Sequence, residues 1–521
     1  EQKSARVPLF VRKKQRRGAA GDTKPTTCGA ATPAIATSRF KMTNSEVCNI
    51  TSSNHISGKK PVYKKERSNV KLEDLPLDVL CTIVSKLPAK EVSRASVLST
   101  NWRYICGICF YKLCFTGADG CCRDSFERDQ YCQYMQRFID HVYVVVQKCH
   151  AKLIEEFNVK FEFDTMLLDH LNNWVNFAVS SQTKSIAIYL CPINKRRTDV
   201  DRYVFPFHLL NSESKISHLQ CIQLSFVSFR PPSEFRGFPS LRKLDLEFVD
   251  ITMKDLDVIS SNCCNLTWLS LVRCFLNCEL KLDHLLSRLL HLKVVRCRVT
   301  RIELRVMKLA TFVYDGCFVP IVLNQDSKLD NAHITFSGAN FQDAVTALLN
   351  GIPSMQHLTL QITWQRLETQ FPLNKIGKFT HLKVLQLLMG VTLEDINKFP
   401  FSILRAAPFI EKLEIHFSGG DNSWFMKKYS GRKHLEQCEY NYLKSMYMTG
   451  YKGAIGQLEF LLHIVGNAPA LEVLTVEMTQ RLYGDIFFDM YKKINLAEQQ
   501  HALSTVLCKS MLSSKVKLCV M

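Results

Sequence analysis

A Leu-x-x-Leu-x-Leu pattern, with other apolar residues in some of its positions, recurs nine times between residues 219 and 476 and limits the possible folds more than any other feature. Each copy predicts a short strand whose apolar side chains all point to one side. One such unit cannot bury that side alone, so neighbouring units must stack. The copies are Leu219/Ile222/Leu224, Leu241/Leu244/Leu246, Leu266/Leu269/Leu271, Leu292/Val295/Cys297, Leu309/Phe312/Tyr314, Met355/Leu358/Leu360, Leu382/Leu385/Leu387, Ile410/Leu413/Ile415 and Leu471/Leu474/Val476.

The intervals between copies predict a repeat of irregular length. The first three are 22, 25 and 26 residues, within the range of leucine-rich repeats. The later ones, 17, 46, 27, 28 and 61, indicate degenerate or inserted units. We therefore expect a curved solenoid.

The residues between the leucines are expected to point outward and to form one concave recognition strip. Their mixed charges argue against a nucleic-acid groove, which would be a basic stripe. Trp268 allows two interpretations, since it either anchors a protein ligand or packs against an adjacent repeat. The candidate target-binding residues are Lys243, Asp245, Trp268, His357, Gln386, Lys412 and His416.

Most of the net charge of +19 lies in the first 70 residues, which hold 15 Lys and Arg against 4 Asp and Glu. This segment has few large apolar residues, so we expect a disordered basic tail over residues 1–70. Its cluster VRKKQRR at residues 11–17 is compatible with nuclear import, with nonspecific phosphate binding or with a merely solvated tail. We expect the protein in the nucleus, the cytoplasm or both.

The remaining composition fits a protein with a substantial core and reduced thiols. Of the 521 residues 46% are hydrophobic, yet there is no run of 18 apolar residues, so no membrane-spanning helix is expected. The 21 cysteines are an odd number, and the N-terminus has no secretory signal, so disulfides are not expected. The sequence begins with Glu1 and not Met, which leaves the completeness of the N-terminus open.

Two helices are predicted after residue 71. In the first, Asp74 suits the cap, Pro76 suits the first turn and Pro88 ends the helix. A second helix is expected from Ala89, and the two apolar stripes cannot be buried by so short a hairpin. The stripes are Leu77, Leu80, Ile83, Val84 and Leu87 in the first helix, and Val92, Ala95, Leu98, Trp102 and Ile105 in the second. The hairpin therefore requires a partner.

The spacing of this segment closely resembles the plant F-box signature. The matching runs are Leu75-Pro76-x-Asp78-Val79-Leu80, Ile83-x-Ser85-x-Leu87-Pro88 and Arg94-x-Ser96-x-Leu98-Ser99-x-x-Trp102-Arg103, while Ile105-Cys106 departs from the usual Leu and aromatic. The resemblance implies docking onto a Skp-type adaptor, which joins a cullin in a ubiquitin ligase. The adaptor-binding residues that it implies are Leu75, Pro76, Val79, Leu80, Ile83, Leu87, Leu98 and Trp102.

The rest of the chain resembles plant F-box proteins with leucine-rich repeats and an FBD region. The lead-in residues 138–142 and 173–178 carry this resemblance, as do His434-Leu435, Leu443-Lys444, Gly450, the run 467–472 and the ending 514–519. The predicted fold class is α/β, with an all-α F-box hairpin before an irregular solenoid. The predicted divisions are a tail at 1–70, an F-box at 71–115, a solenoid with its lead-in at 116–415 and an FBD-like region at 416–521.

Motifs of enzyme chemistry are weak in this sequence. The pairs Asp140-His141, Asp169-His170 and Asp283-His284 are sequence neighbours, which face different directions in a helix or strand. The five thiols of Cys106, Cys109, Cys114, Cys121 and Cys122 lack paired zinc spacing. The run Gly450-x-x-Gly453-x-x-Gly456 lacks the Lys of a phosphate loop. We therefore predict no catalytic residue, metal or cofactor.

Three functions are compatible with these features. The first, which we favour, is the substrate-recognition subunit of a Skp-cullin-F-box ubiquitin ligase, with a target protein held on the solenoid. The alternatives are a nuclear nucleic-acid-associated protein that uses the basic tail, or an F-box protein with a non-degradative scaffold role. The identity of the target, the signal that licenses its binding and the presence of a small molecule in the solenoid stay open.

Overall fold

The computed structural model describes residues 72–85, 87, 89–108, 112–117, 128–149, 154–190, 202–210, 216–324, 329–339, 341–363, 378–390, 399–418, 438–452, 455–479, 503 and 516–521. The chain divides into two units, residues 1–69 and 70–521. The predicted basic tail with its cluster at residues 11–17 lies outside the described residues. All described helices and strands belong to the second unit.

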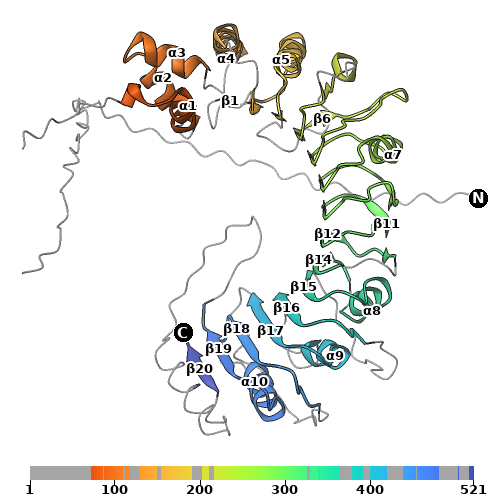
Figure 1. Cartoon of the computed structure of the whole chain (residues 1–521). Helices are drawn as coiled ribbons and strands as arrows, with labels where there is room; N and C mark the ends of the chain where they lie inside the picture. The colour runs from red at the N-terminus through yellow and green to blue at the C-terminus, as the bar shows by residue number, and fades with distance from the viewer. Residues whose placement is uncertain are drawn as a thin grey trace, which may run out of the picture. The chain divides into compact units, whose positions relative to one another are not determined.

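Fifteen of the described strands form one sheet in which every pair of neighbours is parallel (Figure 1). In sheet order the strands are β1 (Lys112–Thr116), β2 (Glu156–Lys160), β3 (Ser185–Tyr189), β5 (Cys221–Ser225), β7 (Lys243–Glu247), β8 (Trp268–Val272), β10 (His291–Val295), β12 (Thr311–Cys317), β14 (Asn331–Ser337), β15 (His357–Thr363), β16 (Val384–Gly390), β17 (Lys412–Ser418), β18 (Ser445–Thr449), β19 (Val473–Glu477) and β20 (Lys517–Val520). Sheet order follows chain order throughout, which is consistent with the predicted repeat solenoid.

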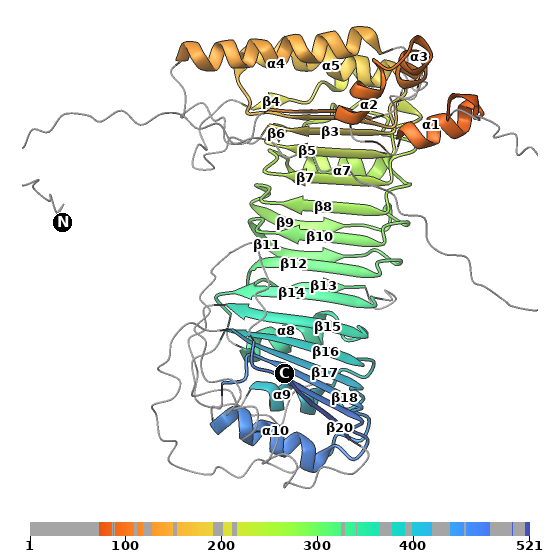
Figure 2. The same cartoon turned by 90° about the vertical axis from the view of Figure 1, so that its left-hand side faces the viewer.

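A second layer covers one face of this sheet. Its helices are α4 (Arg128–Lys148), α5 (Leu168–Ser180), α7 (Met253–Asn262), α8 (Phe341–Gly351), α9 (Phe399–Ala406) and α10 (Ile455–Asn467), with short 3-10 helices η3 (Thr165–Leu167) and η4 (Phe207–Leu210). Between β8 and β14 short strands replace the helices, namely β9 (Cys278–Leu282), β11 (Val299–Leu304) and β13 (Ile321–Leu323), and β4 (Tyr203–Val204) pairs with β6 (Val227–Ser228) near the start. Figure 2 looks at the other face, with α7, α8 and α9 behind the strands.

At the start of each strand of the main sheet from β5 to β19, two successive backbone amides donate hydrogen bonds to one carbonyl oxygen of the preceding repeat. The oxygen of Arg242 accepts from the amides of Thr267 and Trp268 at 2.8 and 2.9 Å. The oxygen of Thr267 accepts in turn from the amides of Leu290 and His291 at 2.9 and 3.0 Å. Because the same arrangement recurs from β5 to β19, successive repeats stack in one fixed register.

The strand register corrects one predicted copy and adds others. In β10, Leu292 and Val294 are opposite Leu269 and Leu271, so the copy is Leu289/Leu292/Val294 and the predicted Leu292/Val295/Cys297 is wrong. The predicted intervals of 46 and 61 residues each contain a strand that the leucine pattern missed. These are β14, with buried Leu329, Ala332 and Ile334, and β18, with buried Leu443, Met446 and Met448.

Three helices, α1 (Leu77–Ser85), α2 (Ala89–Ala95) and α3 (Thr100–Ile108), replace the predicted hairpin of two after the short η1 (Leu72–Asp74). The expected second helix breaks at residues 96–98, and the side chain of Ser99 starts α3 by accepting from the amide of Trp102 at 3.0 Å. The break moves Leu98 off the buried stripe. The small core of α1–α3 is separate from the core of the sheet and contains Leu80, Val84, Val92, Trp102, Ile105 and Cys106.

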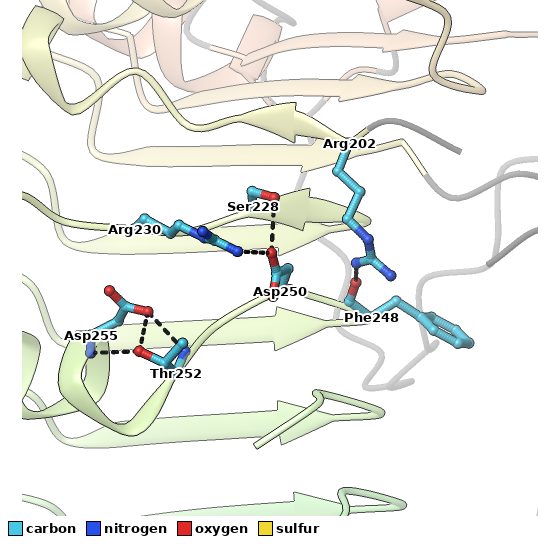
Figure 3. A network of polar contacts seen from close by, with 7 residues as sticks. All are labelled: Arg202, Ser228, Arg230, Phe248, Asp250, Thr252 and Asp255. Atoms are coloured by element: carbon cyan, nitrogen blue, oxygen red, sulfur yellow. Dashed lines mark hydrogen bonds and ion pairs between the residues drawn. The ribbon is translucent and has the colours of Figure 1, made fainter. Parts of the chain in front are cut away.

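The strand-to-helix connection before α7 shows how polar side chains hold a repeat together (Figure 3). Thr252 and Asp255 form a reciprocal capping box at the start of α7. Two residues earlier, Asp250 accepts hydrogen bonds from Arg230 at 2.6 Å and from Ser228 at 3.3 Å. These contacts join the residues after β6 to those after β7 and so fix the spacing of two repeats.

The predicted FBD-like region, residues 416–521, continues the same sheet through β18, β19 and β20. Its predicted start at residue 416 lies inside β17. Among the described residues, no helix is both long and apolar enough to cross a membrane.

Candidate functional site

The eight predicted adaptor-binding residues separate by exposure into supports and surface. Leu80 and Trp102 are buried in the small helical core, and Leu75 and Ile83 are half-buried. The exposed members are Pro76, Val79, Leu87 and Leu98. Leu80 and Trp102 are placed to hold the helices together, Leu75 and Ile83 keep part of their surface in solvent, and the exposed members are available for contact.

Sequence reasoning did not assign four further exposed apolar side chains of this region to the adaptor surface. Leu98 and its neighbour Val97 are each 72% exposed in the turn between α2 and α3. The four exposed side chains that the sequence analysis did not assign to the adaptor surface are Leu72, Leu77, Val97 and Tyr104. Of the 18 large hydrophobic side chains that are exposed among the described residues, seven lie between residues 72 and 104. Such a concentration of apolar surface is typical of a docking site.

The second candidate surface is the outward face of the sheet, the side that bears no second layer among the described residues (Figure 2). Because all strands are parallel and in register, side chains on this face form rows that cross the strands. One row passes through Lys243, Trp268, His291, Thr311, Asn331, His357, Val384 and Lys412. The next row includes Asp245, Gln386 and Glu414. Six of the seven predicted target-binding residues therefore lie in two neighbouring rows.

Trp268 is held by its neighbours in the row. The ammonium group of Lys243 lies 5.6 Å from the centroid of its ring, and the ring of His291 lies 5.0 Å away on the other side. The indole nitrogen is buried and has no hydrogen-bond partner among the described residues. Trp268 is half-buried and packs against the two adjacent repeats, and its role as an anchor for a protein ligand stays a prediction.

His416 is the one predicted target-binding residue that is buried, with 1% of its surface exposed. It lies on the outward face, but its ring nitrogens form hydrogen bonds with Gln386 at 3.0 Å and with Thr449 at 2.9 Å. The ring of Tyr447 also packs against it at 5.7 Å. The prediction that His416 meets the target is therefore wrong for this conformation, and the residue links β16, β17 and β18 instead.

Glu414 contacts three of the predicted target-binding residues, Gln386, Lys412 and His416. It accepts a hydrogen bond from Gln386 at 3.0 Å and forms an ion pair with Lys412 at 2.7 Å. The hydrogen bond with His416, followed by the contact with Lys412, lowers the pKa of Glu414 to about 2. Gln386 is thus half-buried and tied to its neighbours, whereas Lys412 and His357 remain exposed.

Asp245 and His357 are each held by one polar neighbour. Lys243 lies 3.9 Å from Asp245, and Asn331 forms a hydrogen bond with the His357 ring at 2.7 Å. These contacts are exposed or half-exposed, so a ligand can replace them at little cost.

The motifs that were considered for enzyme chemistry serve local packing where the structure describes them. Asp140 accepts from Gln136 at 2.9 Å, while the ring of His141 lies against Phe115. His170 forms a hydrogen bond with the hydroxyl of Tyr143 at 3.1 Å. The members of each Asp-His pair that are seen here do not converge on one site.

A glutamine side chain of α10 forms hydrogen bonds with backbone groups of the residues just before this helix. The carboxamide of Gln457 accepts from the amide of Lys452 at 2.8 Å and donates to the oxygen of Gly450 at 3.1 Å. The backbone groups that a phosphate would need are therefore partly occupied.

The part of the chain that the structure describes has no cluster of metal-ligating side chains. That part of the chain contains no group of three or more His, Cys, Asp or Glu side chains placed to hold a metal ion. Of the five thiols noted in the sequence, Cys109, Cys121 and Cys122 lie outside the described residues.

Comparison with known proteins agrees with the fold. Residues 72–112 match the F-box domain, and residues 145–521 match the family described as "At1g61320/AtMIF1, LRR domain". The F-box/FBD/LRR-repeat protein At1g13570 of Arabidopsis thaliana is 23% identical over 78% of this chain and 90% of its own length. The F-box/LRR-repeat protein At3g03360 of the same plant is 24% identical over 70% of this chain and 74% of its own length. The repeat-domain match covers well over half of the sequence and follows an F-box, so this chain belongs to the plant family of F-box/LRR/FBD proteins.

Proposed function

We propose that this protein is the substrate-recognition subunit of a Skp-cullin-F-box ubiquitin ligase. The F-box implies binding of a Skp-type adaptor, and through the adaptor we propose a cullin as the scaffold. The observation that carries the proposal is the concentration of seven exposed large hydrophobic side chains between residues 72 and 104. Apolar surface of this kind is stabilised when a partner removes it from water.

The three short helices supply a rigid base for this surface. Trp102 and Leu80 are buried beneath it, so the exposed Val97 and Leu98 project from a packed support. A preorganised surface costs less conformational entropy on binding than a flexible one. The exposed residues are therefore the proposed contacts, and the buried ones are the proposed supports.

The repeat sheet is the proposed platform for the target. Its outward face offers exposed or half-exposed polar groups of both signs, among them Lys243, Asp245, His357, Gln386 and Lys412. The F-box would fix one end of the chain while the sheet holds a target near the ubiquitin-charged enzyme, which raises the effective concentration of the two reactants. Catalysis would belong to other subunits. We propose that the divisions at residues 71–115, 116–415 and 416–521 apply to these roles, and that the ligase acts in the nucleus, the cytoplasm or both.

A binding titration with paired charge variants tests the adaptor contact. The full chain is titrated with a purified plant Skp-type adaptor, and Val97→Asp plus Leu98→Asp is compared with Val144→Asp plus Leu168→Asp. The control pair repeats the same substitutions at exposed sites on α4 and α5. Desolvating a carboxylate in an apolar contact costs several kcal/mol, so the first pair is expected to abolish binding and the control pair to leave it within about twofold.

The outcomes separate the alternatives. Loss of binding in the first pair alone, with unchanged circular dichroism, supports the ligase subunit. Equal loss in both pairs, or no binding by the folded wild type, contradicts it.

A further inference from the structure

Four successive strands of the sheet end in the same unusual backbone conformation. The residues after β5, β7, β8 and β10 are Phe226, Phe248, Arg273 and Arg296, with φ of 61°, 52°, 54° and 51°. Positive φ is unfavourable for residues with a Cβ, and more so for bulky ones. Glycine would adopt it freely, yet this chain places large aromatic and cationic side chains there. Strain of this kind often accompanies a binding surface.

The backbone conformation keeps the amides bonded and brings the side chains together. The amide of Phe248 donates to the oxygen of Val272 at 2.8 Å, and the amide of Arg273 donates to the oxygen of Val295 at 2.7 Å. The guanidinium carbon of Arg273 then lies 4.9 Å from the centroid of the Phe248 ring. This distance is within the range of a cation–π contact.

Arg202 extends the stack across the strand ends. It donates to the backbone oxygen of Phe248 (Figure 3), and its guanidinium carbon lies 4.6 Å from the Phe226 ring and 5.9 Å from the Phe275 ring. The guanidinium carbon of Arg298 lies 6.0 Å from the same Phe275 ring. We call this set the arginine–phenylalanine edge, and it consists of Arg202, Phe226, Phe248, Arg273, Phe275 and Arg298.

Arg273 and Arg298 differ from four other cations of the repeats. Lys243, Lys281, Arg305 and Lys412 each have a carboxylate of their own strand or of the residues next to it within 4 Å. Among the described residues, neither Arg273 nor Arg298 forms an ion pair with a carboxylate within 4 Å, and the guanidinium group of each lies beside an aromatic ring. The ring of Phe275 beside them belongs to a residue that is 38% exposed.

We propose that the arginine–phenylalanine edge binds an acidic peptide segment of the target protein. Carboxylates of the segment face Arg273 and Arg298, and an apolar side chain of the segment covers Phe275. This inference rests on the proposed function for the existence of a target, and it adds the chemistry of the segment that is recognised.

Charge complementarity favours an acidic peptide over a nucleic acid. Glu247 precedes Phe248, and Asp315 lies 3.5 Å from Arg296, so carboxylates are interspersed with the cations at these strand ends. A polyphosphate chain would meet both signs, whereas a peptide can match single cations with single carboxylates.

Selection from a random library of displayed 12-residue peptides tests the edge without a known target. The baits are the full chain, Arg273→Glu plus Arg298→Glu, and the matched control Arg242→Glu plus Lys308→Glu. The control residues are exposed cations that precede β7 and β12, at the opposite ends of the strands. Each enriched peptide is then synthesised and titrated against all three proteins, with a random 12-nucleotide RNA pool as competitor.

The wild type and the control are expected to enrich peptides with an excess of Asp and Glu around an apolar residue. The affinity of those peptides should fall roughly tenfold or more in the Arg273/Arg298 variant and stay within about twofold in the control. An enriched pool without acidic excess, or equal affinity for all three proteins, overturns the proposal. Displacement of the peptides by RNA at lower concentration than by acidic peptide also overturns it.

Adaptor binding distinguishes failure of this inference from failure of the proposed function. The Arg273/Arg298 variant is titrated with the same Skp-type adaptor and should bind as the wild type does. If adaptor binding persists while no acidic peptide is selected, the edge proposal is wrong and the ligase proposal stands. If acidic peptides bind but the wild type does not bind the adaptor, the ligase proposal is wrong and the edge proposal stands.

Discussion

Truncation of Leu80 is predicted to unfold α1–α3 while the repeat sheet stays intact. Leu80 is one of six residues in the small helical core and is 2% exposed. Replacing a buried leucine by alanine costs about 2–5 kcal/mol. A loss of ~3 kcal/mol in the free energy of unfolding of these helices raises the population of their open state by roughly 100-fold. A core of so few residues has little stability in reserve.

Hydrogen exchange measured by mass spectrometry reports the two cores separately. In Leu80→Ala, the amides of α1, α2 and α3 should exchange much faster, while those of β7, β8 and β10 keep their wild-type protection, because the two hydrophobic cores do not share residues. The matched control is Leu98→Ala, the same truncation at a residue that is 72% exposed, and it should change stability by less than about 0.5 kcal/mol. Unchanged exchange in the helices, or faster exchange in the strands as well, would refute this reasoning.

Three further predictions concern the repeat sheet. Gly351→Ala should lower the melting temperature, since its Cβ would lie 1.8 Å from the backbone oxygen of Ile321, whereas Gly466→Ala, with nothing within 4 Å, should not. Because the pKa of Glu414 is lowered from 4.5 to about 2 in the folded state, the ionised carboxylate stabilises the fold above pH 4.5, and this stability is lost as pH falls toward 2. The wild type should therefore lose more stability than Glu414→Gln between about pH 5 and pH 3. Thr252→Ala should cost about 1 kcal/mol and speed amide exchange in the first turn of α7.

Each of these predictions has a contradicting result. Equal melting temperatures for the two glycine variants would mean that α8 can move away from β13 without cost. Parallel acid-unfolding curves for wild type and Glu414→Gln would show that the ion pair and hydrogen bonds of Glu414 do not stabilise the folded state. Normal exchange at α7 in Thr252→Ala would mean that packing alone starts this helix.

The leucine spacing predicted most strands because the same residues face the core in every repeat. It missed β14 and β18, where Ala332 and Met446 occupy leucine positions. It shifted β10 because Leu292, Val295 and Cys297 imitate the pattern three residues too late. Local apolar spacing identifies a strand but does not fix its register when neighbouring residues are also apolar.

The helical region and the outward face required information that sequence spacing does not contain. The apolar stripe of residues 92–105 is continuous, but the Ser99 cap divides it into α2 and α3 and leaves Leu98 exposed. His416 lies on the predicted face, yet its burial depends on Gln386 and Thr449, which are 30 and 33 residues away in the chain. Positive φ at Phe248 and Arg273 could not be predicted, because these residue types rarely adopt it.

Exposure also decides which variants report on docking. A charge at Leu80 would disrupt the helical core and remove binding for a trivial reason, since Leu80 is buried. Val97 and Leu98 lie in an exposed turn, so charges there act on the surface alone.

The most direct measurement of the central claim is the hydrogen-exchange footprint of a Skp-type adaptor on the full chain. We predict that the adaptor slows exchange in α1, α3 and the turn at residues 96–98, where the exposed apolar side chains lie, and leaves the strands from β7 to β16 unchanged. Protection confined to the strands, or no protection at all at a saturating adaptor concentration, would contradict the account.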